Sequence, residues 1–289
     1  MAEISAKAVK LLRDKTDVGM MDCKRALTEA GGDIEKAIEI LRERGLAKAG
    51  KREGRTTAEG VISIALDGRQ GGMVELACET DFVARTDEFA AFSAALAGAV
   101  VDDAALDSVQ ALLAALIGAE KVSEKITAVM AKLGENVVIK RVARLQVDGL
   151  GVVGGYVHAG GKLGVLVALD TPSDGSEFEA LAKDLSMHVA AADPTPVAVT
   201  RDGISQEFLS KEREIFRRQA LQEGKPEKVI ERIVEGKINK YVAEICLIEQ
   251  PFVKDPDQAV GDLLKQAGEV SVSAFERFKL GQAGEEPGE

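Results

Sequence analysis

The chain is poor in the residues that carry metal, redox and disulfide chemistry. It has two histidines, three cysteines and no tryptophan among 289 residues. The cysteines lie far apart and form no C-x-x-C pair, so their spacing indicates neither a zinc site nor a disulfide framework. We expect Cys23, Cys78 and Cys246 to be buried reduced thiols, because free cysteine is often buried. No cofactor and no metal site are predicted.

Long apolar runs are also missing. The nearest approach, the alanine-rich stretch 90–101, falls short of the ~18 apolar residues that cross a bilayer. Charged residues interrupt the start of the chain at Glu3, Lys7 and Lys10, so no signal or transit peptide is evident. We therefore expect a cytoplasmic protein with no membrane partner.

Basic residues are outnumbered, 37 against 48 acidic, which gives a net charge of −11 and an isoelectric point near 5.0. A surface of that sign repels phosphate backbones unless a local basic patch compensates, so nucleic acid is not a predicted partner. Hydrophobic residues make up 46% of the chain, enough for ordinary cores, and the length favours two or more folded units. The acidic net charge favours protein partners over nucleic acid.

The first fifty residues predict three short helices, because apolar residues recur there at helical spacing. Gly31 and Gly32 should end the second helix, and Asp33 can cap the third. This predicts a three-helix module in residues 1–55. Its last part, residues 48–57, is rich in Lys, Arg and Gly and predicts a flexible linker.

Beyond the linker the period of the apolar pattern becomes that of strands. Two strands at 61–66 and 73–78 and a helix at 87–101 are expected, and the same order returns at 153–158, 163–169 and 176–191. A strand at 136–147 completes the first half. The pattern predicts an α+β core of two related β-β-α subdomains, residues 56–150 and residues 151–203 with 241–261.

Residues 204–240 predict a protruding antiparallel helical hairpin, a coiled coil inserted in the second subdomain. Each arm has a narrow apolar stripe, and residues 223–226 break the helix with glycine and proline. A strand at 247–253 and a short helix at 260–266 are expected to follow. Residues 262–289 would then form a short helical C-terminal module and tail, with disorder predicted from residue 281.

Catalytic and nucleotide-binding patterns are weak. His188 lies in a helical stretch that looks half-buried, where a locally hydrogen-bonded ring is expected. Cys78 and His158 could form a nucleophile and base, but nothing marks a third orienting group. The G-x-G-x-x-G match at 149–154 continues as strand instead of opening a helix, and residues 160–163 lack the spacing of a phosphate loop. Neither an enzyme nor direct nucleotide binding is predicted.

Residues 79–86 place charged, polar and aromatic side chains at a strand-to-helix junction, where a loop can present them to a partner. There is also a structural interpretation: Thr80 or Asp81 caps a helix, and Phe82 anchors the junction in the core. Composition favours the structural interpretation and does not exclude the other.

Three stretches carry a resemblance to a known family: residues 16–27 (TDVGMMDCKRAL), 75–85 (ELACETDFVAR) and 134–141 (GENVVIKR). Shorter similarities follow at 156–158, 187–194, 250–253 and 275–278. They occur in family order over nearly the whole chain, and together they resemble the bacterial elongation factor Ts family. Asp17 departs from the pattern, since the family more often has glycine there.

The resemblance implies a non-enzymatic guanine-nucleotide exchange factor of translation elongation. Such a factor binds elongation factor Tu carrying GDP and promotes GDP release, so that GTP can reload, by inserting side chains near the magnesium and phosphate site. On this sequence the implied exchange residues are Thr80, Asp81, Phe82, Val83 and His158, and the implied docking residues of the N-terminal module are Val18, Met20 and Met21.

The implied layout is a UBA-like N-terminal domain, a core of two similar subdomains, a projecting helical hairpin and a C-terminal module. Whether the hairpin pairs with a second copy of the chain stays open. So does a rival interpretation, a structural adaptor that binds the GTPase without changing nucleotide dissociation.

Overall fold

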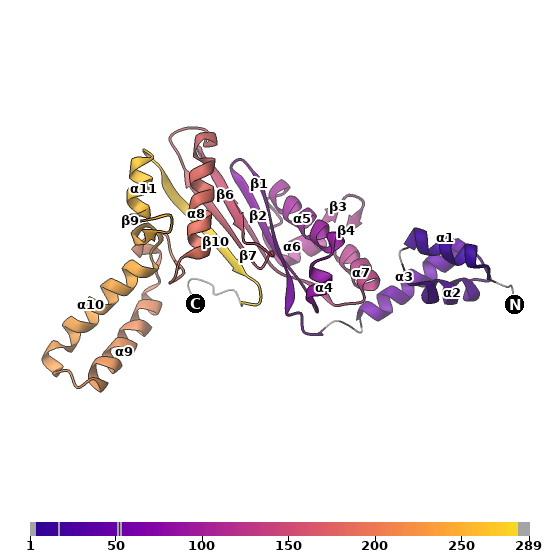
Figure 1. Ribbon diagram of the computed structural model, residues 1–289, viewed down its shortest axis with the longest axis horizontal. Coiled ribbons are helices and arrows are strands. Elements are labelled where there is room, and N and C mark those ends of the chain that lie inside the picture. Colours follow the sequence, from indigo (N-terminus) through magenta and orange to yellow (C-terminus); the bar gives the residue numbers. More distant parts are fainter. Residues whose placement is uncertain (1–3, 17, 51, 53, 283–289) are drawn as a thin grey trace.

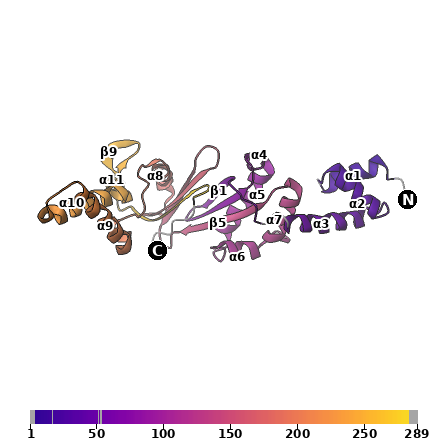
Figure 2. The ribbon, with the colours of Figure 1, turned by 90° about the horizontal axis from the view of Figure 1, so that it is seen from below.

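The computed structural model describes residues 4–16, 18–50, 52 and 54–282. Asp17 and most of the tail predicted to be disordered lie outside these residues. The described chain mixes helices and antiparallel strands, so the α+β class is confirmed. It is elongated: three helices form one end, a helical hairpin projects at the other, and two sheets lie between them (Figures 1 and 2).

The N-terminal end contains α1 (Ala6–Thr16), α2 (Met20–Glu29) and α3 (Ile34–Gly50). Leu12, Cys23 and Leu27 are fully buried at the centre of this module. Gly31 and Gly32 adopt positive φ after α2, and the Asp33 carboxylate accepts a hydrogen bond from the Lys36 backbone N–H at 3.1 Å. The predicted stop and cap are therefore confirmed.

The predicted flexible linker is wrong for its first residues, because α3 continues as helix to Gly50. Helix α3 contacts α7 (Val122–Leu133) of the core, and Arg52 Nη1 donates to the Met130 carbonyl at 2.7 Å. A segment with little to bury can still be fixed when an arginine donates to a carbonyl near the end of a neighbouring helix.

The first sheet has the antiparallel order β1 (Glu59–Asp67), β2 (Gln70–Cys78), β5 (Val137–Gln146). The helices beside it are α4 (Asp81–Ala84), α5 (Asp87–Asp102), α6 (Val109–Ala114) and α7, with a small hairpin of β3 (Leu116–Ile117) and β4 (Glu120–Lys121). Phe89, Leu96 and Leu112 fill the apolar layer between this sheet and its helices. The strands overlap the ranges predicted from the sequence.

The second sheet has the order β6 (Gly151–Val157), β7 (Leu163–Asp170), β10 (Ser271–Lys279), and α8 (Glu179–Ala191) contacts it. Here β10 holds the place that β5 holds in the first sheet. The predicted helical C-terminal module is therefore wrong in part: α11 (Val260–Gln266) is helical, but β10 is a strand of the core. The adjacent charges of Glu276 and Arg277 obscure its period-two pattern.

The two sheets pack face to face with helices on their outer sides. Ile62, Met73 and Leu166 lie in the apolar layer between them. The approach is close: a Cβ added at Gly164 would meet Ile62 Cγ2 at 2.5 Å, so glycine is required there. At one border of this layer the Arg141 guanidinium lies 4.2 Å from the centre of the Phe278 ring.

The hairpin consists of α9 (Gln206–Gln222) and α10 (Glu227–Ile245), which contact each other and project from the core (Figure 1). Arg217 and Glu231 form an ion pair of 2.5 Å between the arms. The predicted strand at 247–253 is largely wrong. It begins as a 3₁₀ turn (Leu247–Glu249), because the Glu249 and Gln250 N–H groups donate to the Cys246 and Leu247 carbonyls. Only β8 (Pro251–Phe252) pairs, with β9 (Asp255–Ala259).

Candidate functional site

The one-turn helix α4 follows β2 and carries the most exposed aromatic residue among the large apolar side chains of the described chain. Thr80 caps α4, its Oγ1 accepting from the Val83 N–H at 3.5 Å. Val83 and Ala84 turn inward into the first core, whereas Phe82 is 81% exposed. The predicted cap is thus confirmed, and the predicted anchoring of Phe82 in the core is wrong. Val83 takes that inward position instead.

Glu135 holds the segment that leads into α4, and the sequence did not assign it a role. Its carboxylate accepts from the backbone N–H of Glu79 at 3.1 Å, from the N–H of Thr80 at 2.9 Å and from Thr80 Oγ1 at 2.5 Å. Glu135 lies in the stretch 134–141 that carries the family resemblance, and that was the available signal.

Asp81 is half-buried in the first turn of α4 and forms an ion pair of 3.0 Å with Arg85 one turn later. A carboxylate at the N-terminal end of a helix is favoured by the free N–H groups there. Asp81 therefore adds a charged rim beside the exposed ring of Phe82.

His158 lies directly after β6, in the exposed turn that joins β6 to β7. Its backbone N–H donates to the Leu163 carbonyl at 2.9 Å, and its ring meets Tyr156 edge-on with centroids 6.3 Å apart. The same turn is bound to β1, because the Gly161 carbonyl accepts from the Ile62 N–H at 2.7 Å.

The turn between β6 and β7 lies at one end of β1, and α4 lies near the same end. Lys162 in that turn forms an ion pair of 2.7 Å with Glu59, the first residue of β1. Glu59 is the register partner of Cys78, two residues before Thr80, and α4 itself contacts β1. Residues from both halves of the core thus gather at one end of the first sheet.

Cys78 is unsuited to nucleophilic catalysis. Burial raises the pKa of its thiol to about 12, and the nearby Glu135 carboxylate acts in the same direction. The thiol instead bonds to the Thr80 carbonyl at 3.2 Å. All three cysteines are free and buried, as predicted.

His188 is fully buried, and the prediction of a half-buried, locally bonded ring is wrong. Its Nδ1 accepts from the Val253 N–H at 3.2 Å, so Nε2 carries the proton and donates to Gln250 Oε1 at 3.0 Å. The Gln250 amide donates in turn to the Pro194 and Glu244 carbonyls at 2.8 and 2.7 Å. This network ties α8 to the base of the helical hairpin, and burial lowers the pKa of His188.

The N-terminal module presents apolar surface at the start of α2. Met20 and Met21 are 57% and 65% exposed, while Val18 is half-buried against the module core. The Val18 carbonyl accepts from the Cys23 thiol at 3.3 Å. Leu11 on α1 is a further exposed apolar side chain that sequence reasoning did not single out.

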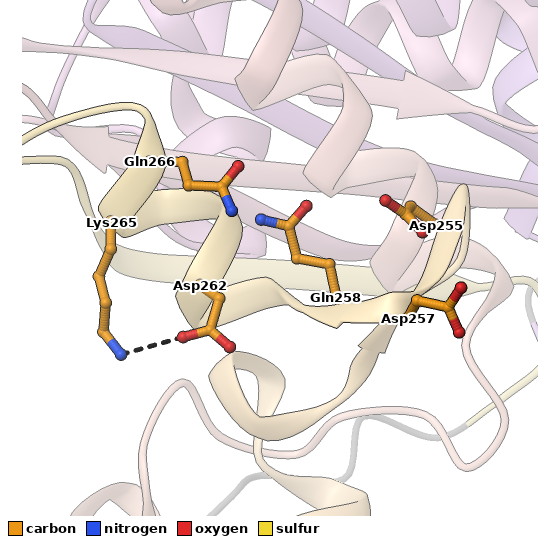
Figure 3. Close-up of a pocket in the computed structure, with 6 residues that line it drawn as sticks. All are labelled: Asp255, Asp257, Gln258, Asp262, Lys265 and Gln266. Atoms are coloured by element: carbon orange, nitrogen blue, oxygen red, sulfur yellow. Dashed lines mark hydrogen bonds and ion pairs between the residues drawn. The ribbon is translucent and has the colours of Figure 1, made fainter.

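The described chain also has surface pockets, and one of them is lined by polar side chains. A pocket on β9 and α11 is lined by Asp255, Asp257, Gln258, Asp262, Lys265 and Gln266, and Figure 3 shows Asp262 already paired with Lys265. It lies far from α4 (Figure 1). Within the described residues no cluster of histidine, cysteine and carboxylates could hold a metal ion. No described helix is long and apolar enough to span a membrane.

Comparison with known proteins gives one consistent result. The family described as "Elongation factor TS" matches residues 79–282. Elongation factor Ts of Clostridium botulinum (strain Alaska E43 / Type E3) is 46% identical over 287 residues, covering 96% of this chain and 93% of the relative. That of Prosthecochloris aestuarii is 45% identical over 294 residues, covering 97% and 100%.

Proposed function

The chain belongs to the elongation factor Ts family, and from this membership we propose that it is a guanine-nucleotide exchange factor of translation elongation whose partner is elongation factor Tu. A GTPase holds its nucleotide through a phosphate loop and a magnesium ion. An exchange factor accelerates release only if it binds the nucleotide-free form more tightly than the loaded form. The chain itself makes and breaks no bond and binds neither nucleotide, nucleic acid nor membrane.

The observation that carries the proposal is the exposure of Phe82 on a segment whose backbone is pinned. A phenylalanine ring normally buries a large apolar area, so one left 81% exposed on a short, capped helix is available to a partner. We assign Phe82 the role of a wedge near the magnesium and phosphate site. Asp81 and His158 contact the partner beside it, and Thr80 and Val83 hold the wedge in place.

The division of the chain supports separate docking and exchange surfaces. Residues 1–55 dock through Met20 and Met21, with Val18 shaping that surface from within the module. The related subdomains, 56–150 and 151–203 with 241–261, present the exchange residues. The hairpin 204–240 is the candidate for self-association, and β10, which lies within residues 262–289, completes the second sheet.

Stopped-flow release of fluorescent GDP from elongation factor Tu tests the wedge. Phe82→Ala should slow release while binding to the nucleotide-free GTPase is only partly weakened. Its melting temperature should match the wild type, because the ring has little buried area to lose. Leu150→Ala is the matched control, an exposed apolar side chain in the loop between β5 and β6.

Two results would contradict this assignment. Normal release by Phe82→Ala, measured per folded molecule, would exclude the wedge. Tight binding of the wild-type chain with no change in GDP dissociation would favour a structural adaptor instead.

A further inference from the structure

The exposed ring of Phe82 needs a backbone that keeps its place without packing around the ring. Apolar contacts hold α4 through Val83 and Ala84. The half-buried carboxylate of Glu135 binds the residues that lead into α4. We infer that Glu135 is a positioning residue that sets the orientation of Phe82, an inference that rests on the proposed function.

The attachment is reciprocal between two segments far apart in sequence. Glu135 accepts from the N–H groups of Glu79 and Thr80, and the Glu79 carboxylate accepts from the N–H of Asn136 at 2.7 Å. Each segment thus contributes an acidic side chain that binds the backbone of the other segment. Arg55 supplies a counter-charge, its Nη1 lying 3.4 Å from Glu79 Oε1.

The course of the chain before Glu135 explains why its carboxylate reaches this place. Gly134 ends α7 in the left-handed conformation, with φ at 81°, and reverses the chain toward β5. The Asn136 side chain then donates to the Arg55 carbonyl at 2.9 Å. We call the paired attachment of Glu79 and Glu135 the clasp. It is fixed from the end of α7, from the start of β5 and from the segment after α3.

The chemistry of the three donors requires an acceptor such as a carboxylate. Thr80 Oγ1 donates its proton to Glu135 and accepts from the Val83 N–H, so the hydroxyl links the clasp directly to the first turn of α4. Alanine at position 135 would leave three donors without this partner at a partly buried site, which is costly. Phe82 is two residues beyond Thr80, so a shift of this backbone changes the direction of the ring.

The lack of tryptophan in the chain allows a direct test of orientation, independent of exchange. Phe82→Trp provides a single reporter whose anisotropy decay measures local motion of the segment. Added to this background, Glu135→Ala should increase the amplitude of fast motion. Glu135→Gln should retain most of the order, because its amide oxygen still accepts from both N–H groups. Glu120→Ala, at an exposed position on β4, is the control.

An unchanged anisotropy decay in a folded Glu135→Ala protein would overturn the inference. If that variant does not fold, Thr80→Val decides in its place. It removes one donor of the clasp and the cap while it keeps the branched shape of the side chain. It should loosen the reporter to an intermediate degree, and an unchanged reporter would again overturn the inference.

The exchange assay separates positioning from general structure. Glu135→Ala should lower the maximal rate of GDP release roughly tenfold, comparable to losing one hydrogen bond to a charged group, with little change in the concentration for half-maximal effect. Adding it to Phe82→Ala should cost little more, because both act through one ring. Full additivity would contradict the inference. A wild-type chain that does not accelerate GDP release refutes the proposed function, whereas the anisotropy result still decides the role of Glu135.

Discussion

Neighbouring residues in the segment 80–83 have different roles, because some of their side chains face the core and others face solvent. Residues 80–83 are consecutive, yet Thr80 caps, Asp81 pairs with Arg85, Phe82 points to solvent and Val83 enters the core. Sequence reasoning found the segment and its cap. Its structural interpretation named Phe82 as the anchor, where the structure has Val83, because a helix of one turn has no periodicity to read.

The buried network of His188 predicts a dependence of stability on pH. Because burial depresses its pKa below the ordinary 6.5, the unfolded chain takes up a proton on His188 before the folded chain does. This contribution to stability is complete above about pH 6.5 and is lost as pH falls below it toward the folded pKa. Urea unfolding at about pH 7.5 and about pH 5.5 measures the loss.

The matched variants for this prediction are His188→Gln and His158→Gln. The first should be less stable at neutral pH but should lose this part of the pH dependence. The second changes an exposed histidine in the same way and is the control. Equal pH dependence in all three proteins would show that the buried ring is not responsible.

The predicted and observed secondary-structure elements agree where the apolar pattern of the sequence is long and uninterrupted. The strands of both hairpins and the arms of α9 and α10 lie close to the predicted ranges. Two of the misses share a physical cause: contacts distant in sequence decide them. The last turns of α3 lie against α7, and β10 is a strand because β7 offers its free edge. Neither partner can be read from the local pattern.

Deleting residues 205–240 and joining the ends with a short glycine linker should leave the two sheets folded. Hydrogen bonds outside the deleted residues hold the base of the hairpin. The Leu247 N–H donates to the Ala198 carbonyl at 2.9 Å, and the Val197 N–H donates to the Ile245 carbonyl at 3.0 Å. Circular dichroism and thermal melting check the fold, and sedimentation checks the oligomeric state.

A shorter deletion, residues 213–235, is the control. It keeps the stacked rings of Phe208 and Tyr241, whose centroids are 6.3 Å apart, near the base. Loss of the thermal transition in both deletions would mean that the hairpin belongs to the core fold. A change of oligomeric state in both would locate self-association in the distal part.

The whole molecule places its proposed docking module and its hairpin at opposite ends of the two sheets (Figure 2). Removing residues 1–55 should greatly weaken binding to the GTPase and leave a folded core. The core should also lose roughly 1–3 kcal/mol of stability, because the bonds of Arg52 to Met130 and of Arg55 to Asn136 are lost. Titration calorimetry and urea unfolding measure the two effects.

The double variant Met20→Ala, Met21→Ala separates these effects. Both side chains are exposed on α2, so affinity should fall while the stability of the core stays at the wild-type value. Unchanged affinity of the truncated chain would refute the docking role of the module.

The position of β10 in the second sheet also bears on the order in which the chain folds during synthesis. About one hundred residues separate the end of β7 at Asp170 from the start of β10 at Ser271. At a synthesis rate of roughly 5–20 residues per second, the free edge of β7 waits at least about 5 s for its partner strand. The helical hairpin made in that interval has local contacts and folds quickly. Closure of the second sheet is therefore expected to be the late step in folding, and the open edge of β7 is the place where a nascent chain is most exposed to wrong pairing.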